Sequence, residues 1–202
     1  MNALLRDRPY NIDYHCLELT ERGRECSTLL ASLNPDLKIR TTPFDYSEPD
    51  FSTLSGYRKI LFFSVASVEQ VSHLPDALVE NMLRLDAEIT CVQLEPVGWQ
   101  RYGELNQLIK LAKQGNDVEP ISSEALSKFI IQRLPNGENG TTPGEMDIKA
   151  ATYAESRGYN KNLLPLISRF HQQGVIEILY YHPNIAGAAE YPSTLIGWRK
   201  RV

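Results

Sequence analysis

The sequence contains no long apolar run. Its longest such stretch is ILFFSVASV, residues 60–68, whereas a membrane-spanning helix needs about 20 predominantly apolar residues. The first eleven residues, MNALLRDRPYN, carry two arginines and an acidic residue where a secretion signal requires an apolar segment. We therefore expect a cytoplasmic protein without membrane contact, and a buried strand within residues 60–68.

The sequence also lacks an excess of basic residues and cysteines at metal-ligand spacing. There are 21 lysines and arginines against 25 aspartates and glutamates, a net charge of -4, and nucleic-acid binding requires a basic surface. The basic cluster WRKRV, residues 198–202, is too short to supply one. The three cysteines, Cys16, Cys26 and Cys91, are an odd set typical of reduced thiols in a cytoplasm. Neither nucleic acid nor a metal ion is therefore expected as a ligand.

Glycine is absent from the first 22 residues. In nucleotide-binding α/β folds a glycine-rich turn closes the first strand, and an acidic residue that binds the ribose follows about 20 residues later. The stretch HCLELTERGREC, residues 15–26, offers such an acid, Glu18, at the end of a predicted strand, but no glycine-rich turn precedes it. Glu18 therefore has the position of a ribose-binding acid without the glycine-rich turn that usually accompanies one.

The 202 residues have an ordinary composition for one globular domain, with 42% hydrophobic and 23% charged residues. Apolar patterns predict strands, and helical spacing with capping and stop signals predicts helices between them. The strands are expected at 12–19, 37–46, 57–65, 87–96, 175–181 and 193–200. The helices are expected after Thr20, which can cap the first of them, at 76–85, 104–114 and 123–134, and between Asn162 and Gly174, with a mobile loop at 135–147.

Strands that alternate with helices predict an α/β fold with a mainly parallel sheet and helices on both faces. The continuous apolar run from Tyr57 to Val65 is typical of a strand buried on both faces. Ser67 and Gln70 after it have the spacing of a capping box. Only the segment HPNIAGAAEYP, residues 182–192, separates the last two strands. It is too short for a helical crossover, so these strands should be antiparallel neighbours.

A parallel sheet finished by an antiparallel strand resembles the class I S-adenosylmethionine-dependent methyltransferases, from about residue 12 to 199. HCLELT resembles the family's second strand, so Glu18 would bind the ribose hydroxyls. TTPFDY resembles the end of the third, where Asp45 would meet the adenine amino group and Tyr46 the base. ILFFSVASVEQV resembles the fourth strand, which places Ser64 at the cofactor, and VQLEPVGW resembles the fifth. The resemblance implies a Rossmann-like fold and S-adenosylmethionine as cofactor.

The missing glycines are where the sequence departs from this family. A family member begins with a strand and a glycine-rich turn, and neither precedes Ile12. The resemblance therefore implies an N-terminally incomplete domain with weak cofactor binding, in which the family's second and fourth strands lack their common neighbour. Exposed strand edges of this kind favour a homo-oligomer or another covering partner.

Two residues are candidates for catalysis. Glu95 closes an apolar strand at its carboxyl end, where open α/β sheets bind ligands, and could orient or deprotonate a substrate hydroxyl; alternatively it pairs with an arginine or caps a turn. His182 ends the next-to-last strand, and its imidazole could act as a base; alternatively it is structural. Glu18, Asp45, Ser64, Glu95 and His182 are expected to converge at the carboxyl ends of the strands.

The phrases SVEQV, EPVGWQ and YNKNLLPL resemble sugar or polysaccharide O-methyltransferases, which implies a saccharide or another small molecule as substrate. Glu69, Trp99, Tyr159 and Asn162 are the candidate substrate-binding residues. Each also has a structural interpretation: Glu69 in the capping box, the two aromatic residues in core packing, and Asn162 as a helix cap.

The chain is thus expected to be a single methyltransferase-like domain, residues 1–202. Residues 12–100 would form its nucleoside-binding part, residues 101–174 a helical region, and residues 175–202 a terminal strand pair. Two alternatives stay open. One is a non-catalytic remnant or protein-binding module of the same fold, and the other is a nicotinamide-dependent oxidoreductase, which also binds a ribose through an acid.

Overall fold

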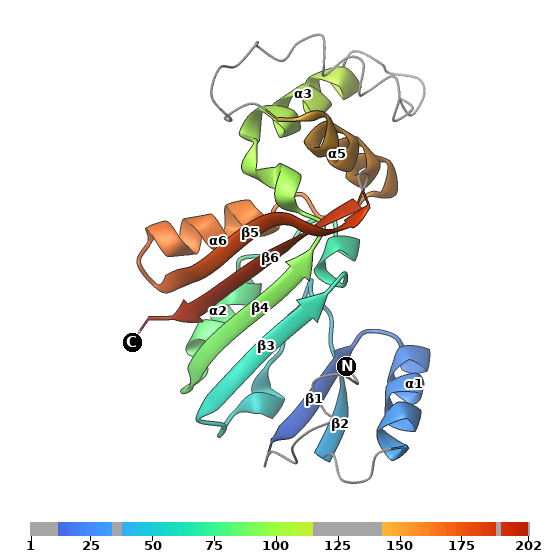
Figure 1. The fold of residues 1–202 in the computed structure, drawn as a ribbon. Coiled ribbons are helices and arrows are strands. Elements are labelled where there is room, and N and C mark those ends of the chain that lie inside the picture. Colours follow the sequence, from blue (N-terminus) through green and yellow to red (C-terminus); the bar gives the residue numbers. More distant parts are fainter. Residues whose placement is uncertain (1–11, 34–37, 115–142, 189–190, 202) are drawn as a thin grey trace. The chain divides into compact units, whose positions relative to one another are not determined.

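The computed structural model describes residues 12–33, 38–114, 143–188 and 191–201. The chain divides into two compact units, Met1–Asp50 and Phe51–Val202 (Figure 1). The single methyltransferase-like domain, with a nucleoside-binding part at residues 12–100, stays a prediction. The division falls after the second strand because the first two strands form one sheet and the remaining four form another.

The first unit is a single βαβ element. Strand β1 (Asp13–Glu18) and strand β2 (Lys38–Pro43) are parallel, and helix α1 (Glu21–Ser32) lies between them in the chain. The predicted cap is confirmed, since the Thr20 side chain accepts a hydrogen bond from the Gly23 backbone N–H at 3.0 Å. No residue of α1 is buried. Leu29 and Leu30 of α1 keep 65% and 57% of their surface exposed, so its apolar side chains are uncovered.

The second unit contains a four-stranded sheet in the order β3-β4-β6-β5. Strands β3 and β4 are parallel, and β6 runs antiparallel to both of its neighbours, β4 and β5. The predicted α/β class and antiparallel last strand are confirmed. The elements are η1 (Ser52–Leu54), β3 (Lys59–Val65), η2 (Val68–Gln70), α2 (Ala77–Arg84), β4 (Glu88–Glu95), η3 (Gly98–Arg101), α3 (Gly103–Gln114), α5 (Glu145–Arg157), α6 (Leu163–Gln172), β5 (Ile176–Ala188) and β6 (Tyr191–Lys200), where η marks a 3-10 helix.

The segment predicted as a loop at 182–192 is mostly strand. Strand β5 continues to Ala188, which pairs with Tyr191, through irregularities between His182 and Ala186. Asn184 and Gly187 have φ values of 55° and 93°, a left-handed conformation that asparagine and glycine adopt more readily than other residues. These two positions let the strand bend and then resume pairing, so the hairpin is longer than its sequence indicates.

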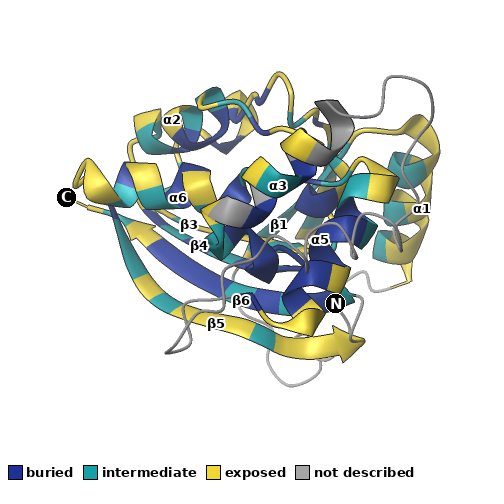
Figure 2. Cartoon of the chain, turned by 90° about the horizontal axis from the view of Figure 1, so that it is seen from above, coloured by how far each residue is buried: buried dark blue, intermediate teal, exposed yellow. Residues whose placement is uncertain are grey.

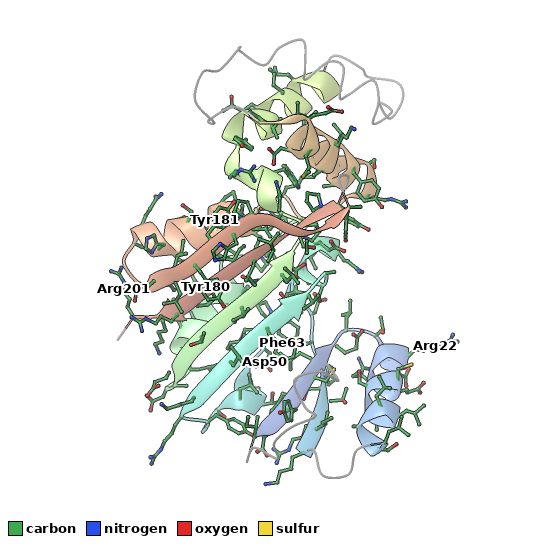
Figure 3. The ribbon with its side chains drawn as sticks, viewed as in Figure 1. Arg22, Asp50, Phe63, Tyr180, Tyr181 and Arg201 are labelled. Atoms are coloured by element: carbon green, nitrogen blue, oxygen red, sulfur yellow. The ribbon has the colours of Figure 1, made fainter. Side chains whose placement is uncertain are left out.

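Helices α2 and α6 lie on the same face of the four-stranded sheet (Figure 2). The buried residues of β4 alternate along the strand, and with Ile196 and Trp198 of β6 they form the face toward α2 and α6. The opposite face carries Leu61, Phe63 and Val65 of β3, which are 58–61% exposed. Phe63 is labelled in Figure 3. The prediction that this apolar run is buried on both faces is therefore wrong for the described residues. The connection from β2 to β3 contains only the short η1, so it supplies no helix for this face.

Helices α2, α3 and α6 agree with the predicted helices, whereas α5 begins inside the segment predicted as a loop at 135–147. Helix α6 begins at Leu163 with Pro165 in its first turn, and Gly174, at φ 75°, follows its end. The predicted helix at 123–134 and most of the predicted loop at 135–147 lie outside the described residues, and α5 begins at Glu145. Within the described ranges, no helix has the length and apolarity to cross a bilayer.

Candidate functional site

The two acids predicted to bind adenosine lie at the same end of the β1–β2 pair. Glu18 is the last residue of β1 and pairs with Pro43, the last residue of β2. The Phe44 backbone N–H donates to the Glu18 carbonyl at 3.2 Å, and Asp45 follows directly. The carboxyl ends of two parallel strands thus bring these acids to one edge, as predicted.

Glu18 uses one carboxylate oxygen to fix its own turn. Its Oε1 accepts hydrogen bonds from the Thr20 backbone N–H and hydroxyl, both at 2.9 Å. The backbone bond, followed by the hydroxyl bond, lowers the pKa of Glu18 below its ordinary value, so the group is ionised near neutral pH. The carboxylate lies over Gly23, where an added Cβ would come within 2.5 Å of its carbon. This close approach is what the absence of a side chain at Gly23 permits.

Asp45 is arranged in the same way. Its Oδ1 accepts hydrogen bonds from the Ser47 hydroxyl and backbone N–H, both at 2.7 Å, which close a turn. The hydroxyl bond and then the backbone bond lower the pKa of Asp45, which is exposed and ionised. Tyr46 packs edge-to-face on Phe44 with ring centroids 5.2 Å apart. Each acid therefore accepts hydrogen bonds from its own turn through one carboxylate oxygen, and its second oxygen can accept a hydrogen bond from a ligand.

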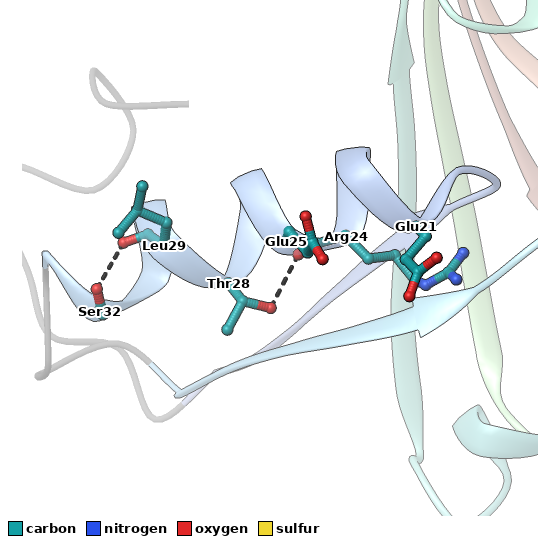
Figure 4. Close-up of a pocket in the computed structure, with 6 residues that line it drawn as sticks. All are labelled: Glu21, Arg24, Glu25, Thr28, Leu29 and Ser32. Atoms are coloured by element: carbon teal, nitrogen blue, oxygen red, sulfur yellow. Dashed lines mark hydrogen bonds between the residues drawn. The ribbon is translucent and has the colours of Figure 1, made fainter.

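A shallow cavity of about 590 Å³ in the first unit does not involve these acids. It is lined by six residues of α1: Glu21, Arg24, Glu25, Thr28, Leu29 and Ser32 (Figure 4). The Thr28 and Ser32 hydroxyls donate to backbone carbonyls of the same helix, at 2.9 and 2.7 Å. All the lining comes from one helix, so polar groups do not converge here from different elements as they do in ligand sites.

In the second unit, Glu95 anchors a turn. The side chain is fully buried, and its carboxylate accepts hydrogen bonds from the backbone N–H groups of Ser67, Val68 and Glu69 at 3.1 to 3.3 Å. These donors begin η2, whose N-terminal residue Ser67 makes no side-chain cap bond. The predicted capping box is therefore wrong, because Glu95 satisfies the donors that a Ser67 cap would serve. The interpretation of Glu95 as a turn cap is supported, although the turn follows β3 and not β4.

Burial raises the pKa of Glu95. The Ser64 hydroxyl and the three backbone donors oppose this effect by favouring the ionised form. Ser64 pairs with Gln93, so it lies on the same face of the sheet as Glu95. The structure thus brings Ser64 and Glu95 together, as predicted. It does not fix the two units relative to one another, so their convergence with Glu18 and Asp45 stays a prediction.

Glu69 lies beside Glu95 in a buried position. It is 3% exposed, and burial raises the pKa of its carboxyl while a hydrogen bond with Tyr191 lowers it. The Tyr191 ring packs edge-to-face on Tyr153 and Tyr159, at centroid distances of 5.8 and 6.2 Å. Tyr153 and Tyr159 contact each other at 6.1 Å. The predicted substrate residues Glu69 and Tyr159 are therefore joined through Tyr191.

The other two predicted substrate residues lie next to this cluster. Trp99 is 1% exposed in a core with Leu105 and Ile109 of α3, against which Tyr159 packs. The Asn162 side chain makes two hydrogen bonds to the Leu74 backbone. Its Oδ1 accepts from the Leu74 N–H at 2.9 Å, and its Nδ2 donates to the Leu74 carbonyl at 2.8 Å. A ligand of Asn162 would have to replace these bonds. The Asn162 side chain makes no cap bond to α6, so the predicted cap is not found, and its role in the structure is to hold the Leu74 backbone.

His182 is separated from Glu95 by the sheet. His182 pairs with Leu195, which pairs with Leu94, whereas Glu95 pairs with Thr194. Paired residues share a face and successive residues alternate, so His182 and Glu95 point to opposite faces. The exposed His182 stacks on Tyr180 with centroids 6.2 Å apart. The expected convergence of His182 with Glu95 is therefore not found, because the register of β5 places His182 on the face opposite to α2 and α6.

Sequence reasoning missed Gln100 and Tyr191 at this edge, whereas Asn160 makes the helix-cap contact that its residue type favours. The Asn160 side chain accepts from the Leu163 and Asn162 backbone N–H groups at 2.8 and 3.0 Å, and the Gln100 side chain donates to the Asn160 carbonyl at 2.8 Å. Tyr191 follows a stretch that the sequence predicts as a loop, so nothing in its spacing indicates a contact with Glu69. The Asn160 and Gln100 side chains lie in polar segments, and only the fold shows that they are buried and hydrogen-bonded to each other.

Comparisons with known proteins add little to this geometry. No family model matches the chain, and no curated protein matches it significantly. Among solved structures, a chain from Rhodobacter sphaeroides provisionally assigned to the Zn-dependent alcohol dehydrogenases is similar over 94% of this chain and 76% of its own, with 12% identity and a TM-score of 0.46. At this level the likeness assigns no activity to the chain. Within the described ranges, no three His, Cys, Asp or Glu residues gather as a metal site would require.

Proposed function

We propose that this chain is a methyltransferase-like domain that holds the adenosine part of S-adenosylmethionine at the carboxyl ends of β1 and β2. It would methylate a hydroxyl of a saccharide or another small molecule. The sheet order carries the proposal: two parallel βαβ elements, β1-α1-β2 and β3-α2-β4, are followed by a hairpin whose last strand lies antiparallel beside β4. This order agrees with the resemblance given by HCLELT and TTPFDY.

Two carboxylates at one edge support the nucleoside part of the proposal. Glu18 and Asp45 are both ionised acceptors that use one oxygen on their own turns. The remaining oxygens can accept from ribose hydroxyls and from an adenine amino group, which are donors. Among the described residues of the first unit, no glycine before Gly23 lets the backbone approach the methionine part closely. Adenosine should therefore bind about as strongly as S-adenosylmethionine.

Calorimetric titration tests this proposal. S-adenosylmethionine, S-adenosylhomocysteine and adenosine should bind with similar, weak affinity, and Glu18→Gln should weaken all three roughly tenfold because a charge-assisted hydrogen bond contributes about 1.5–3 kcal/mol. Glu25→Gln on the exposed side of α1 is the matched control and should bind as the unchanged protein does. Binding that is unaffected by Glu18→Gln, or tight binding of S-adenosylmethionine but not adenosine, would contradict it.

A second candidate is a protein-binding module of the same fold. The uncovered side chains of Leu61, Phe63 and Val65 on β3 favour it, because exposed apolar patches mark interaction sites. A homo-oligomer would cover them. Light scattering should then show association that Phe63→Lys abolishes, whereas a wild-type monomer at all concentrations would remove this candidate in its self-associating form.

A further inference from the structure

Besides Ser64 Oγ, which faces Glu95, three buried polar atoms of the second unit have no hydrogen-bond partner among the described residues. They are Glu69 Oε2 in η2, Trp99 Nε1 in η3 and Asn184 Oδ1 in β5. Glu69 and Trp99 are 3% and 1% exposed. An unsatisfied buried polar group costs about 1–3 kcal/mol, and native proteins keep few of them. Their presence at one edge of the sheet points to a ligand or ordered water that satisfies them.

The chain ties these atoms to the same region. The Asn160 backbone N–H donates to the Glu69 carbonyl at 2.7 Å, and the preceding residue, Tyr159, packs against the Trp99 core. Asn184 Oδ1 lies against η3, since a Cβ added to Gly98, next to Trp99, would be 2.6 Å from it. The left-handed backbone of Asn184, φ 55°, orients this side chain. Residues far apart in sequence are therefore gathered around the turns that follow β3 and β4.

Aromatic rings provide the outer part of this region. Tyr153, Tyr159 and Tyr191 contact one another in pairs with centroids 5.8 to 6.2 Å apart. All three rings are partly exposed, in contrast to Glu69 and Trp99 behind them. Tyr191 lies close enough to the Glu69 carboxyl to lower its pKa, and so connects the two layers. A ligand approaching from solvent would meet the tyrosines first and the unpaired polar atoms beyond them.

The chemistry of these atoms selects a class of ligand. Glu69 Oε2 and Asn184 Oδ1 can accept hydrogen bonds, while Trp99 Nε1 can only donate one. Hydroxyl groups both donate and accept, so an uncharged compound with several hydroxyls can satisfy all three atoms. A phosphate or carboxylate ligand would face the buried acids Glu69 and Glu95 and is disfavoured by their charge. The C–H faces of a sugar ring would also pack on the tyrosines.

We propose that Glu69, Trp99 and Asn184 form a saccharide-binding site behind the Tyr153–Tyr159–Tyr191 cluster. The role of this saccharide as methyl acceptor rests on the proposed function, whereas its binding does not. Glu69 would hold one hydroxyl through Oε2, and Trp99 would donate to a neighbouring hydroxyl oxygen. Opening of the tyrosine cluster would admit the sugar.

The two tryptophans of the chain give an internal test by nuclear magnetic resonance. The Trp198 indole N–H donates to Gln93 Oε1 at 3.4 Å, whereas the Trp99 indole N–H has no partner among the described residues. Glucose, galactose, xylose and maltose would be titrated separately, without S-adenosylmethionine, into protein labelled with ¹⁵N. At least one sugar should shift the Trp99 indole resonance saturably and leave that of Trp198 unchanged. Glu69→Gln should weaken this binding at least tenfold. The control Glu80→Gln, at an exposed position of α2, should leave it unchanged.

Several outcomes would overturn the proposal. They are a Trp99 indole that exchanges only with an ordered water and responds to no sugar, equal shifts of both indoles, or undiminished binding by folded Glu69→Gln. The wild-type titration decides the matter even where Glu69→Gln fails to fold. Because no cofactor is present in this titration, its failure leaves the adenosine proposal standing, and a wild-type protein that binds no adenosine leaves the saccharide proposal standing.

Discussion

Replacing Glu95 with alanine should strongly destabilise the second unit. The Glu95 carboxylate accepts the backbone N–H groups of Val68 and Glu69 in buried surroundings and that of Ser67 in partly buried ones. Leaving a buried donor without its acceptor costs about 1–3 kcal/mol, so the two buried donors alone predict a loss of about 2–6 kcal/mol. That is a large part of a total stability of about 5–15 kcal/mol. Urea unfolding followed by tryptophan fluorescence measures the loss.

Two comparisons sharpen this experiment. Glu95→Gln keeps an amide oxygen as acceptor and should lose less than the alanine variant. Glu88→Ala, at the exposed start of the same strand, removes an ion pair with Lys59 at 3.0 Å and should cost about 0–1 kcal/mol. Hydrogen exchange of residues 67–69 should accelerate only in the Glu95 variants. A loss below about 1 kcal/mol in Glu95→Ala, with unchanged exchange at these amides, would refute the assignment of Glu95 as the anchor of η2.

Two further substitutions probe the acids. Gly23→Ala should weaken adenosine binding several-fold with little change in stability, because the new Cβ displaces the Glu18 carboxylate. The control Gly103→Ala, whose Cβ meets open space, should leave both binding and stability unchanged. Unchanged adenosine binding in Gly23→Ala would remove Glu18 from the site. Burial raises the pKa of Glu69 above its ordinary value of 4.5, so the folded state binds more protons and stability falls as pH rises from about 4.5 through the folded-state pKa. Glu69→Gln should reduce this fall, measured by urea unfolding at about pH 5 and about pH 8, and an identical pH dependence would contradict it.

Local signals in the sequence predicted much of the fold because they act within a few residues. The Thr20 cap, Pro165 in the first turn of α6 and Gly174 after its end depend on backbone geometry that neighbouring residues determine. The antiparallel last pair followed from the length of its connection alone. The positions of Glu18 and Asp45 at one edge followed equally from parallel strands and their ends.

What depends on tertiary contacts could not be predicted. A carboxylate at the end of an apolar strand can face a ligand or a neighbouring turn, and only the fold shows that Glu95 meets the donors of η2. The face occupied by His182 depends on the register of β5, in which a shift by one residue reverses every side chain. The exposure of one face of β3 could not be predicted either, because the apolar composition of a strand does not specify which of its faces a helix covers.

The central claim is that adenosine binds at the carboxyl ends of β1 and β2, and mapping of the backbone amides by nuclear magnetic resonance tests it most directly. Titration with S-adenosylhomocysteine should shift the amides of residues 18–23 and 44–47, because Glu18 and Asp45 would exchange their free oxygens for ligand donors. Other amides of the first unit should shift less. No shift in either segment at millimolar ligand, or shifts confined to the second unit, would contradict the account.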